Sequence, residues 1–234
     1  MGTLTRPGGV FMGSIGNWYF VHGAGRTGTT YMLRLFNSNA QRYVSDIGLG
    51  RLLLGLNDVR EIDKDQIVRD LAENISDNAR TGWGRGLDFV FKQAKCSRNT
   101  YNYLVDMFGP PSRSLFCMRD PAGYMASAEK KFDQVTHDRL RSAYLRSFDL
   151  FDQIGGDVFE YGPAQSRAKL RAYLDAIAFP ANAVTEERLQ AFAFRGAQKP
   201  ELVTPQMQNR YDQFVSRLTA ISTTFLSQQF HVGA

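Results

Sequence analysis

The stretch Val21-His22-Gly23-Ala24-Gly25-Arg26-Thr27-Gly28-Thr29-Thr30 is the part of the chain that decides its fold class. It follows an apolar run over residues 18–21 and opens an apolar helical pattern over residues 31–36. A strand that turns through glycines into a helix N-terminus directs backbone N–H groups and the positive end of the helix dipole to one place. The stretch therefore predicts a phosphate or sulfate site, the alternative being a glycine-rich turn without a ligand.

The glycine spacing narrows the kind of anion site. Gly23 and Gly28 are spaced as in a P-loop, but Thr29 stands where the nucleotide-hydrolysing version has lysine. Because that lysine normally reaches the β- and γ-phosphates, its absence argues against an ordinary ATPase or kinase. The cation of this loop is Arg26 instead.

The charge balance favours an anionic partner. The 234 residues include 28 basic and 23 acidic side chains, which gives a net charge of +5 and a pI near 9.3. Such an excess suits a nucleotide, a nucleic acid or an acidic surface. The basic residues are scattered and no RNP-like aromatic pattern accompanies them, so we expect no nucleic-acid partner.

Two cysteines, Cys96 and Cys117, are too few for a disulfide scaffold or a zinc site. We find neither the apolar core of a signal peptide nor an apolar run of membrane-spanning length. These features predict a cytoplasmic protein with no membrane span, and they leave the oligomeric state open.

Apolar periodicity predicts alternating strands and helices along the chain. The expected strands cover residues 17–21, 87–91, 114–118 and 157–161, and the expected helices cover 28–37, 63–80, 99–108, 122–132, 136–154, 165–178 and a last helix that Thr204 caps and Pro205 begins. Residues 1–16 read as an N-terminal arm, and the apolar segment 49–56 is of uncertain type. The alternation predicts one domain over residues 1–234, with a three-layer α/β/α, P-loop NTPase-like fold around a mostly parallel sheet.

A second motif follows the expected strand at 114–118. Arg119-Asp120-Pro121 comes directly after that strand, and Ser127 lies eight residues beyond the arginine. An arginine at the end of a buried strand is costly unless its charge is used, and arginine with a hydroxyl makes a good phosphate clamp. The alternative is that Arg119 pairs with Asp120 or another carboxylate.

Together the two motifs resemble the sulfotransferases that use 3′-phosphoadenosine 5′-phosphosulfate (PAPS). That family has a Lys/Arg-Ser/Thr-Gly-Thr-Thr loop for the 5′-phosphosulfate, which here reads Arg26-Thr27-Gly28-Thr29-Thr30. It also has a later strand that ends in Arg-Asp/Asn-Pro, with a serine eight residues on, for the 3′-phosphate. The resemblance runs from about residue 20 to residue 179.

Three weaker matches extend it. Residues 95–99 resemble the family's Lys-Thr-Pro-x-Asn segment, and residues 158–162 resemble its Arg-Tyr-Glu-Asp-Leu strand, although the acidic pair after the tyrosine is missing. Arg195-Gly196 faintly resembles the Arg-Lys-Gly segment that closes over the 3′-phosphate, the alternative being a surface arginine. The resemblance thus implies a cofactor site made of Gly25, Arg26, Thr27, Gly28, Thr29, Thr30, Arg119, Ser127, Tyr161, Arg195 and Gly196.

The activity implied by the resemblance is transfer of a sulfuryl group from PAPS to a hydroxyl or amine of a small-molecule or glycan acceptor. As in phosphoryl transfer, positioning and electrostatics carry most of the catalysis, and no metal is required in principle. Arg26 and Lys95 are the candidate cations at the bridging oxygen. The alternative is a P-loop nucleotide-binding, kinase-like protein, but this needs a Mg²⁺-binding aspartate at the strand tip that Arg119 occupies.

The sequence favours an aspartate over a histidine as the general base. The cytosolic branch of the family carries a histidine two residues after the lysine, where this chain has Ser97. Other branches use a carboxylate after the first helix, and Asp46 is the nearest match, the alternative being a solvated turn aspartate. His22 and His137 are the next candidates for the base.

Overall fold

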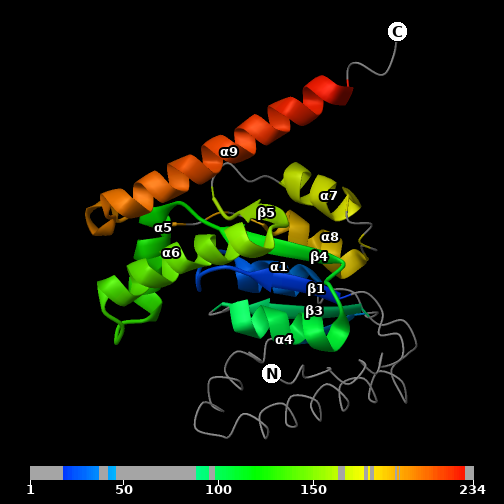
Figure 1. Cartoon of the computed structure of the whole chain (residues 1–234), viewed down its shortest axis with the longest axis horizontal. Coiled ribbons are helices and arrows are strands. Elements are labelled where there is room, and N and C mark those ends of the chain that lie inside the picture. Colours follow the sequence, from blue (N-terminus) through cyan, green and yellow to red (C-terminus); the bar gives the residue numbers. More distant parts are fainter. Residues whose placement is uncertain are drawn as a thin grey trace, which may run out of the picture.

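The computed structural model describes residues 18–36, 42–45, 88–94, 98–162, 167–176, 179, 182–192, 194 and 196–229. Within this part, strands and helices alternate along most of the chain, and the helices lie on both sides of a sheet (Figure 1). The chain therefore has an α/β fold.

The described strands form one parallel sheet. β1 (Trp18–His22), β2 (Arg42–Ser45), β3 (Asp88–Gln93), β4 (Arg113–Met118) and β5 (Asp157–Glu160) are arranged in the order β2-β3-β1-β4-β5. Each neighbouring pair is parallel, and the register sets His22 of β1 beside Phe116 of β4. The residues that follow β1 and β4 therefore leave the sheet side by side at its carboxyl edge.

The connections divide the helices between the two faces. α1 (Thr29–Phe36) connects β1 to β2 on one side of β1, whereas α4 (Arg98–Phe108) crosses β1 in the opposite direction to reach β4. Because parallel crossovers are right-handed, this reversal sends the two helices to opposite faces. α5 (Pro121–Lys131) and α6 (His137–Ile154) continue from β4 to β5 on the face of α4.

The remaining helices complete the two layers. α7 (Arg167–Ala176) and α8 (Ala183–Gln190) join α1, while α9 (Pro205–Gln229) follows the short 3₁₀ turn η1 (Pro200–Leu202) and packs with α5 and α6. One buried cluster, centred on Val21, Met32 and Cys117, lies between the sheet and α1, α7 and α8. The other, centred on Phe116, Tyr144 and Phe214, lies between the sheet and α5, α6 and α9.

The expected elements are largely confirmed. All four expected strands are present within two residues of their expected bounds, and Thr204 caps α9 by accepting a hydrogen bond from the Met207 amide (3.3 Å). The prediction missed β2, α8 and η1. The expected arm 1–16, the segment 49–56 and the helix 63–80 lie outside the described residues. No helix in the described part is both long and apolar enough to cross a membrane.

Candidate functional site

The glycine loop, residues 23–28, joins β1 to α1 and lies against the end of β4. Gly23 and Gly28 have φ angles of +146° and +97°, which residues with a side chain rarely adopt. A Cβ on Gly23 would overlap the carbonyl oxygen of Cys117, and one on Gly28 would lie 2.8 Å from the Cβ of Tyr161. The two glycines thus allow the loop to lie close to the ends of β4 and β5.

Thr27 stabilises the loop by hydrogen bonds to another residue of the same loop. Its buried side-chain hydroxyl donates to the carbonyl oxygen of Ala24 at 2.7 Å, and its amide approaches the same oxygen at 3.3 Å. Helix α1 then begins, with the amide of Met32 bonded to the carbonyl oxygen of Gly28. The predicted contacts of Gly25, Thr27, Gly28, Thr29 and Thr30 with a cofactor stay a prediction.

Arg26 connects the two sequence motifs. Its Nε donates to the Oγ of Ser127 at 3.0 Å, across 101 positions of sequence. Among the described residues, Arg26 is the only one other than glycine with a positive φ, at +85°. Strained backbone of this kind concentrates at functional sites. The structure therefore brings the exposed loop arginine and the predicted clamp serine into contact.

Arg119 is a buried cation at the end of β4. It is 4% exposed, and its Nε has no hydrogen-bond partner. Its guanidinium carbon lies 5.4 Å from the ring centre of Tyr161 and 5.1 Å from that of Phe194. Burial lowers the pKa of Arg119, the nearby carboxylate of Asp120 opposes this shift, and the charge of Arg26 adds to it. A desolvated cation of this kind is stabilised when an anion binds beside it.

The carboxylate of Asp120 caps a helix. Its Oδ1 accepts a 2.7 Å hydrogen bond from the Gly123 amide at the start of α5, where Pro121 is the first helical residue. The Arg119 backbone is fixed from the other side, because its carbonyl oxygen accepts a 2.7 Å bond from the Tyr144 hydroxyl. Arg119 and Asp120 make no hydrogen bond with each other, because Arg119 Nε and Asp120 Oδ2 both lack a hydrogen-bond partner.

A group of aromatic rings lies beside Arg119. Tyr31 of α1 lies 4.9 Å from Phe192 and 6.4 Å from Tyr161, and Tyr161 lies 5.5 Å from Phe194, all between ring centres. The hydroxyl of Tyr31 is buried without a hydrogen-bond partner. Of these four residues, only Tyr161 was predicted from the sequence to belong to the site. Tyr31 directly follows the Thr-Thr pair, which was the available signal for it.

Lys92 is a further cation beside the site, three residues before Lys95, and it could take the place of that lysine. It belongs to β3, and its Nζ donates to the Oγ1 of Thr30 at 3.0 Å. The lysine therefore reaches the N-terminus of α1 from the neighbouring strand. The signal in the sequence was its position near the carboxyl end of an expected strand.

Three predicted site residues, Lys95, Asp46 and Arg195, lie outside the described residues. Gly196 is described, and a Cβ on it would lie 2.5 Å from Nη2 of Arg119. Gly196 therefore lies directly beside the predicted anion-binding arginine.

The two reserve candidates for the base do not reach this group. His22 is fully buried on the α6 side of the sheet, with its ring 5.2 Å from Phe20 and 5.3 Å from Phe116. Burial lowers the pKa of His22 to about 3, so neither its position nor its basicity suits a base. His137 lies at the start of α6 and pairs with Glu129 at 3.0 Å.

The described residues contain no group of three or more His, Cys, Asp or Glu side chains arranged to hold a metal ion. Comparison with models of known families and with curated protein sequences gives no match. Evidence for the function therefore comes from the geometry of the site.

Proposed function

We propose that this chain is a PAPS-dependent sulfotransferase with a P-loop NTPase-like fold. The observation that carries the proposal is the convergence of the glycine loop, Arg26, Ser127 and Arg119 beyond the carboxyl ends of β1 and β4. From β1 the chain crosses to β2 on one side, and from β4 it crosses to β5 on the other side. Ligands of open α/β sheets bind where two adjacent strands have connections in opposite directions.

Two separate cations suit a nucleotide with two separate anionic groups. Arg26, on the loop at the N-terminus of α1, would face the 5′-phosphosulfate, where backbone N–H groups and the helix dipole add to its charge. Arg119, with Ser127 on the following helix, would hold the 3′-phosphate. The aromatic rings of Tyr31, Tyr161 and Phe192 suit packing against the nucleobase, which is attached to the same ribose as the two anionic groups.

The proposed reaction is an in-line transfer. The acceptor oxygen or nitrogen attacks sulfur, the bond from sulfur to the bridging oxygen breaks, and adenosine 3′,5′-bisphosphate leaves. Arg26, Lys95 and also Lys92 are the cations proposed to meet the charge that develops on the bridging oxygen. Asp46 remains the proposed base that takes the proton of the acceptor. The acceptor is proposed to be a small molecule or a glycan.

A kinase-like nucleotide-binding protein is the second candidate. One observation favours it: Lys92 reaches Thr30 at the N-terminus of α1 and supplies a phosphate-directed cation that the loop itself lacks at Thr29. Such a protein would bind ATP with Mg²⁺ and gain nothing from a 3′-phosphate.

Calorimetry with three nucleotides tests the proposal. We expect binding of adenosine 3′,5′-bisphosphate to be at least tenfold tighter than binding of adenosine 5′-monophosphate, since one charge-assisted bond contributes about 1.5–3 kcal/mol. ATP with Mg²⁺ should bind weakly. Equal affinity for the bisphosphate and the monophosphate would contradict the proposal, and preference for Mg²⁺-ATP would support the kinase-like alternative.

A further inference from the structure

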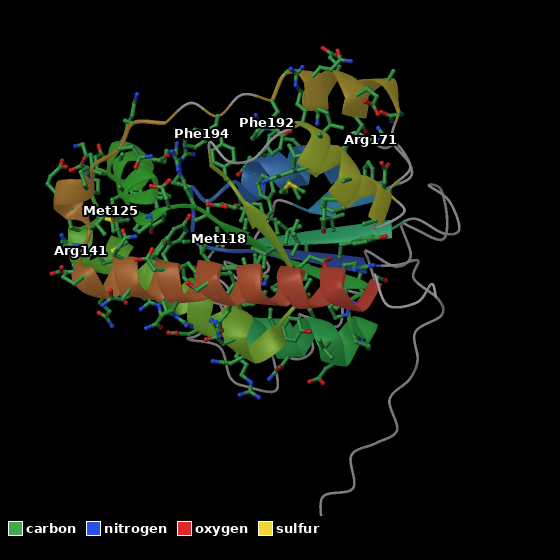
Figure 2. All side chains as sticks on the ribbon, turned by 90° about the horizontal axis from the view of Figure 1, so that it is seen from above. Met118, Met125, Arg141, Arg171, Phe192 and Phe194 are labelled. Atoms are coloured by element: carbon green, nitrogen blue, oxygen red, sulfur yellow. The ribbon has the colours of Figure 1, made fainter. Side chains whose placement is uncertain are left out.

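The guanidinium of Arg119 is covered by the segment between α8 and α9. We call residues 196–203 the strap. Gly196 begins it directly beside Nη2 of Arg119, and Phe194 just before it places its ring 5.1 Å from the guanidinium carbon. In Figure 2 this segment runs from α8 across the molecule to the end where α5 lies, with Phe192 and Phe194 near its start. The strap therefore contributes to the burial of the predicted 3′-phosphate cation.

The strap is fastened to the helices that follow β4. The amide of Lys199 donates to the carbonyl oxygen of Ala122 in the first turn of α5, at 3.2 Å. The carbonyl oxygen of Leu202 accepts two bonds from Arg141 of α6, at 3.1 and 3.0 Å from Nε and Nη2. Between these two attachments, the strap lies over the beginning of α5.

Glu129 of α5 is the side chain that fastens the centre of the strap. One of its carboxylate oxygens accepts a hydrogen bond from Nζ of Lys199, and the other lies 3.0 Å from Nε2 of His137 on α6. Glu129 is two residues beyond Ser127 on the same helix. It thus connects the strap, α5 and α6 without touching the predicted nucleotide site.

We propose that Glu129 is a positioning residue for the 3′-phosphate site: it holds the strap over Arg119 through Lys199. This inference rests on the proposed function. When the strap is closed, it keeps water away from the guanidinium of Arg119. The attraction between this guanidinium and a bound phosphate is then stronger than in solvent. When the strap opens, the phosphate is hydrated and the nucleotide dissociates. Glu129 therefore slows the dissociation of ligands that carry a 3′-phosphate and leaves other nucleotides unaffected.

The test compares two nucleotides on the Glu129→Gln variant. We expect adenosine 3′,5′-bisphosphate to bind about two- to fivefold more weakly, the effect typical of losing an exposed ion pair, with the loss in the dissociation rate. Affinity for adenosine 5′-monophosphate should not change. Lys199→Met should give the same loss, and the double variant should lose no more than either single one. In an Arg119→Ala background, Glu129→Gln should have no further effect.

Asp152→Asn is the matched control. Asp152 of α6 pairs with Arg210 and Arg217 of α9, away from the strap, and its side chain is 36% exposed against 32% for Glu129. This variant should keep wild-type affinity for both nucleotides. Hydrogen exchange gives a second readout that needs no ligand: the Lys199 amide should exchange faster in Glu129→Gln and at the wild-type rate in Asp152→Asn.

Unchanged bisphosphate affinity in Glu129→Gln, or equal losses for both nucleotides, would overturn the inference. A Glu129→Gln effect that persists undiminished in the Arg119→Ala background would also overturn it. A wild-type protein without preference for the bisphosphate would instead overturn the proposed function, and the role of Glu129 in a 3′ site with it.

Discussion

At the scale of single residues, Arg26 is held in a conformation that its side chain disfavours. A positive φ on a residue with a Cβ costs about 1–2 kcal/mol, and Arg26 adopts a φ of +85°. Its Nε bond to Ser127 is a single contact of an exposed side chain. The loop therefore accepts strain at the position where a cation faces the proposed phosphosulfate.

Arg26→Gly should be more stable than Arg26→Ala by about 1 kcal/mol. This reverses the usual order, because alanine keeps the strained φ whereas glycine adopts it freely. Both variants should lose transferase activity, since both lack the cation. Denaturant unfolding of the two variants measures the difference, and an alanine variant as stable as the glycine variant would show that the loop is not strained.

Arg119→Met should raise stability while it removes 3′-phosphate recognition. Methionine fills much of the same volume and leaves no desolvated charge between Tyr161 and Phe194, so we expect a gain of about 1 kcal/mol in the free energy of unfolding. Affinity for adenosine 3′,5′-bisphosphate should fall by about 1.5–3 kcal/mol. Calorimetry that shows equal losses for the bisphosphate and the 5′-monophosphate would remove Arg119 from the 3′ site.

Lys92→Ala should lower kcat more than it raises KM for the donor. If the lysine meets charge that appears only in the transition state, kcat should fall by about 10²-fold. Lys92→Arg should retain part of the activity. A change confined to KM would assign Lys92 to ground-state binding of the donor.

At the scale of elements, the sequence predicted best where structure is encoded locally. The strand, glycine loop and helix at residues 18–36 have their glycines at the required positions, and Asp120 and Pro121 mark the start of α5. β2 and β5 both have four residues, but β5 directly follows the Gly155-Gly156 pair that ends α6, whereas no glycine or proline stands immediately before β2. The helix α8 was missed because it buries only Thr185 and Leu189, which is too few for an apolar period, whereas the equally long α1 has an apolar face.

The parts of the site that escaped prediction depend on contacts between distant segments. Tyr31 and Phe192 meet although 161 positions separate them in the sequence, and Lys92 reaches Thr30 only because β3 lies beside β1. The family resemblance placed Arg26 and Ser127 in one cofactor site but did not predict the hydrogen bond between them, since spacing alone does not determine which strands are neighbours. Strand order, which a single sequence does not encode locally, supplies these contacts.

Asp120→Ala should cost about 1 kcal/mol of stability through loss of the α5 cap. The Asp120 carboxylate satisfies the Gly123 amide, and α5 carries Ser127 to the glycine loop. Asp120→Asn should retain most of the stability, because its amide oxygen accepts the same bond. Chemical denaturation compares the three proteins. Equal stability of the alanine variant and the wild type would mean that the cap contributes nothing.

At the scale of the whole molecule, the two core layers have different chemistry near the site. The layer under α1, α7 and α8 is apolar against the sheet, whereas the layer under α4, α6 and α9 contains a histidine in its aromatic packing. His22 is fully buried, and neither ring nitrogen has a hydrogen-bond partner. The fold therefore accepts only the neutral form of this side chain.

This arrangement makes global stability depend on pH. The pKa of His22 is about 3 in the folded protein and 6.5 when the side chain is solvated, so between these values the unfolded chain binds more protons than the folded one. The contribution of His22 to the free energy of unfolding is therefore complete above about pH 6.5. It falls by about 1.4 kcal/mol per pH unit as the pH drops toward 3. His22→Phe keeps a ring between Phe20 and Phe116 and should remove this slope. Denaturant unfolding of both proteins from pH 7.5 to 4.5 measures it, and parallel curves would show that another group governs acid unfolding.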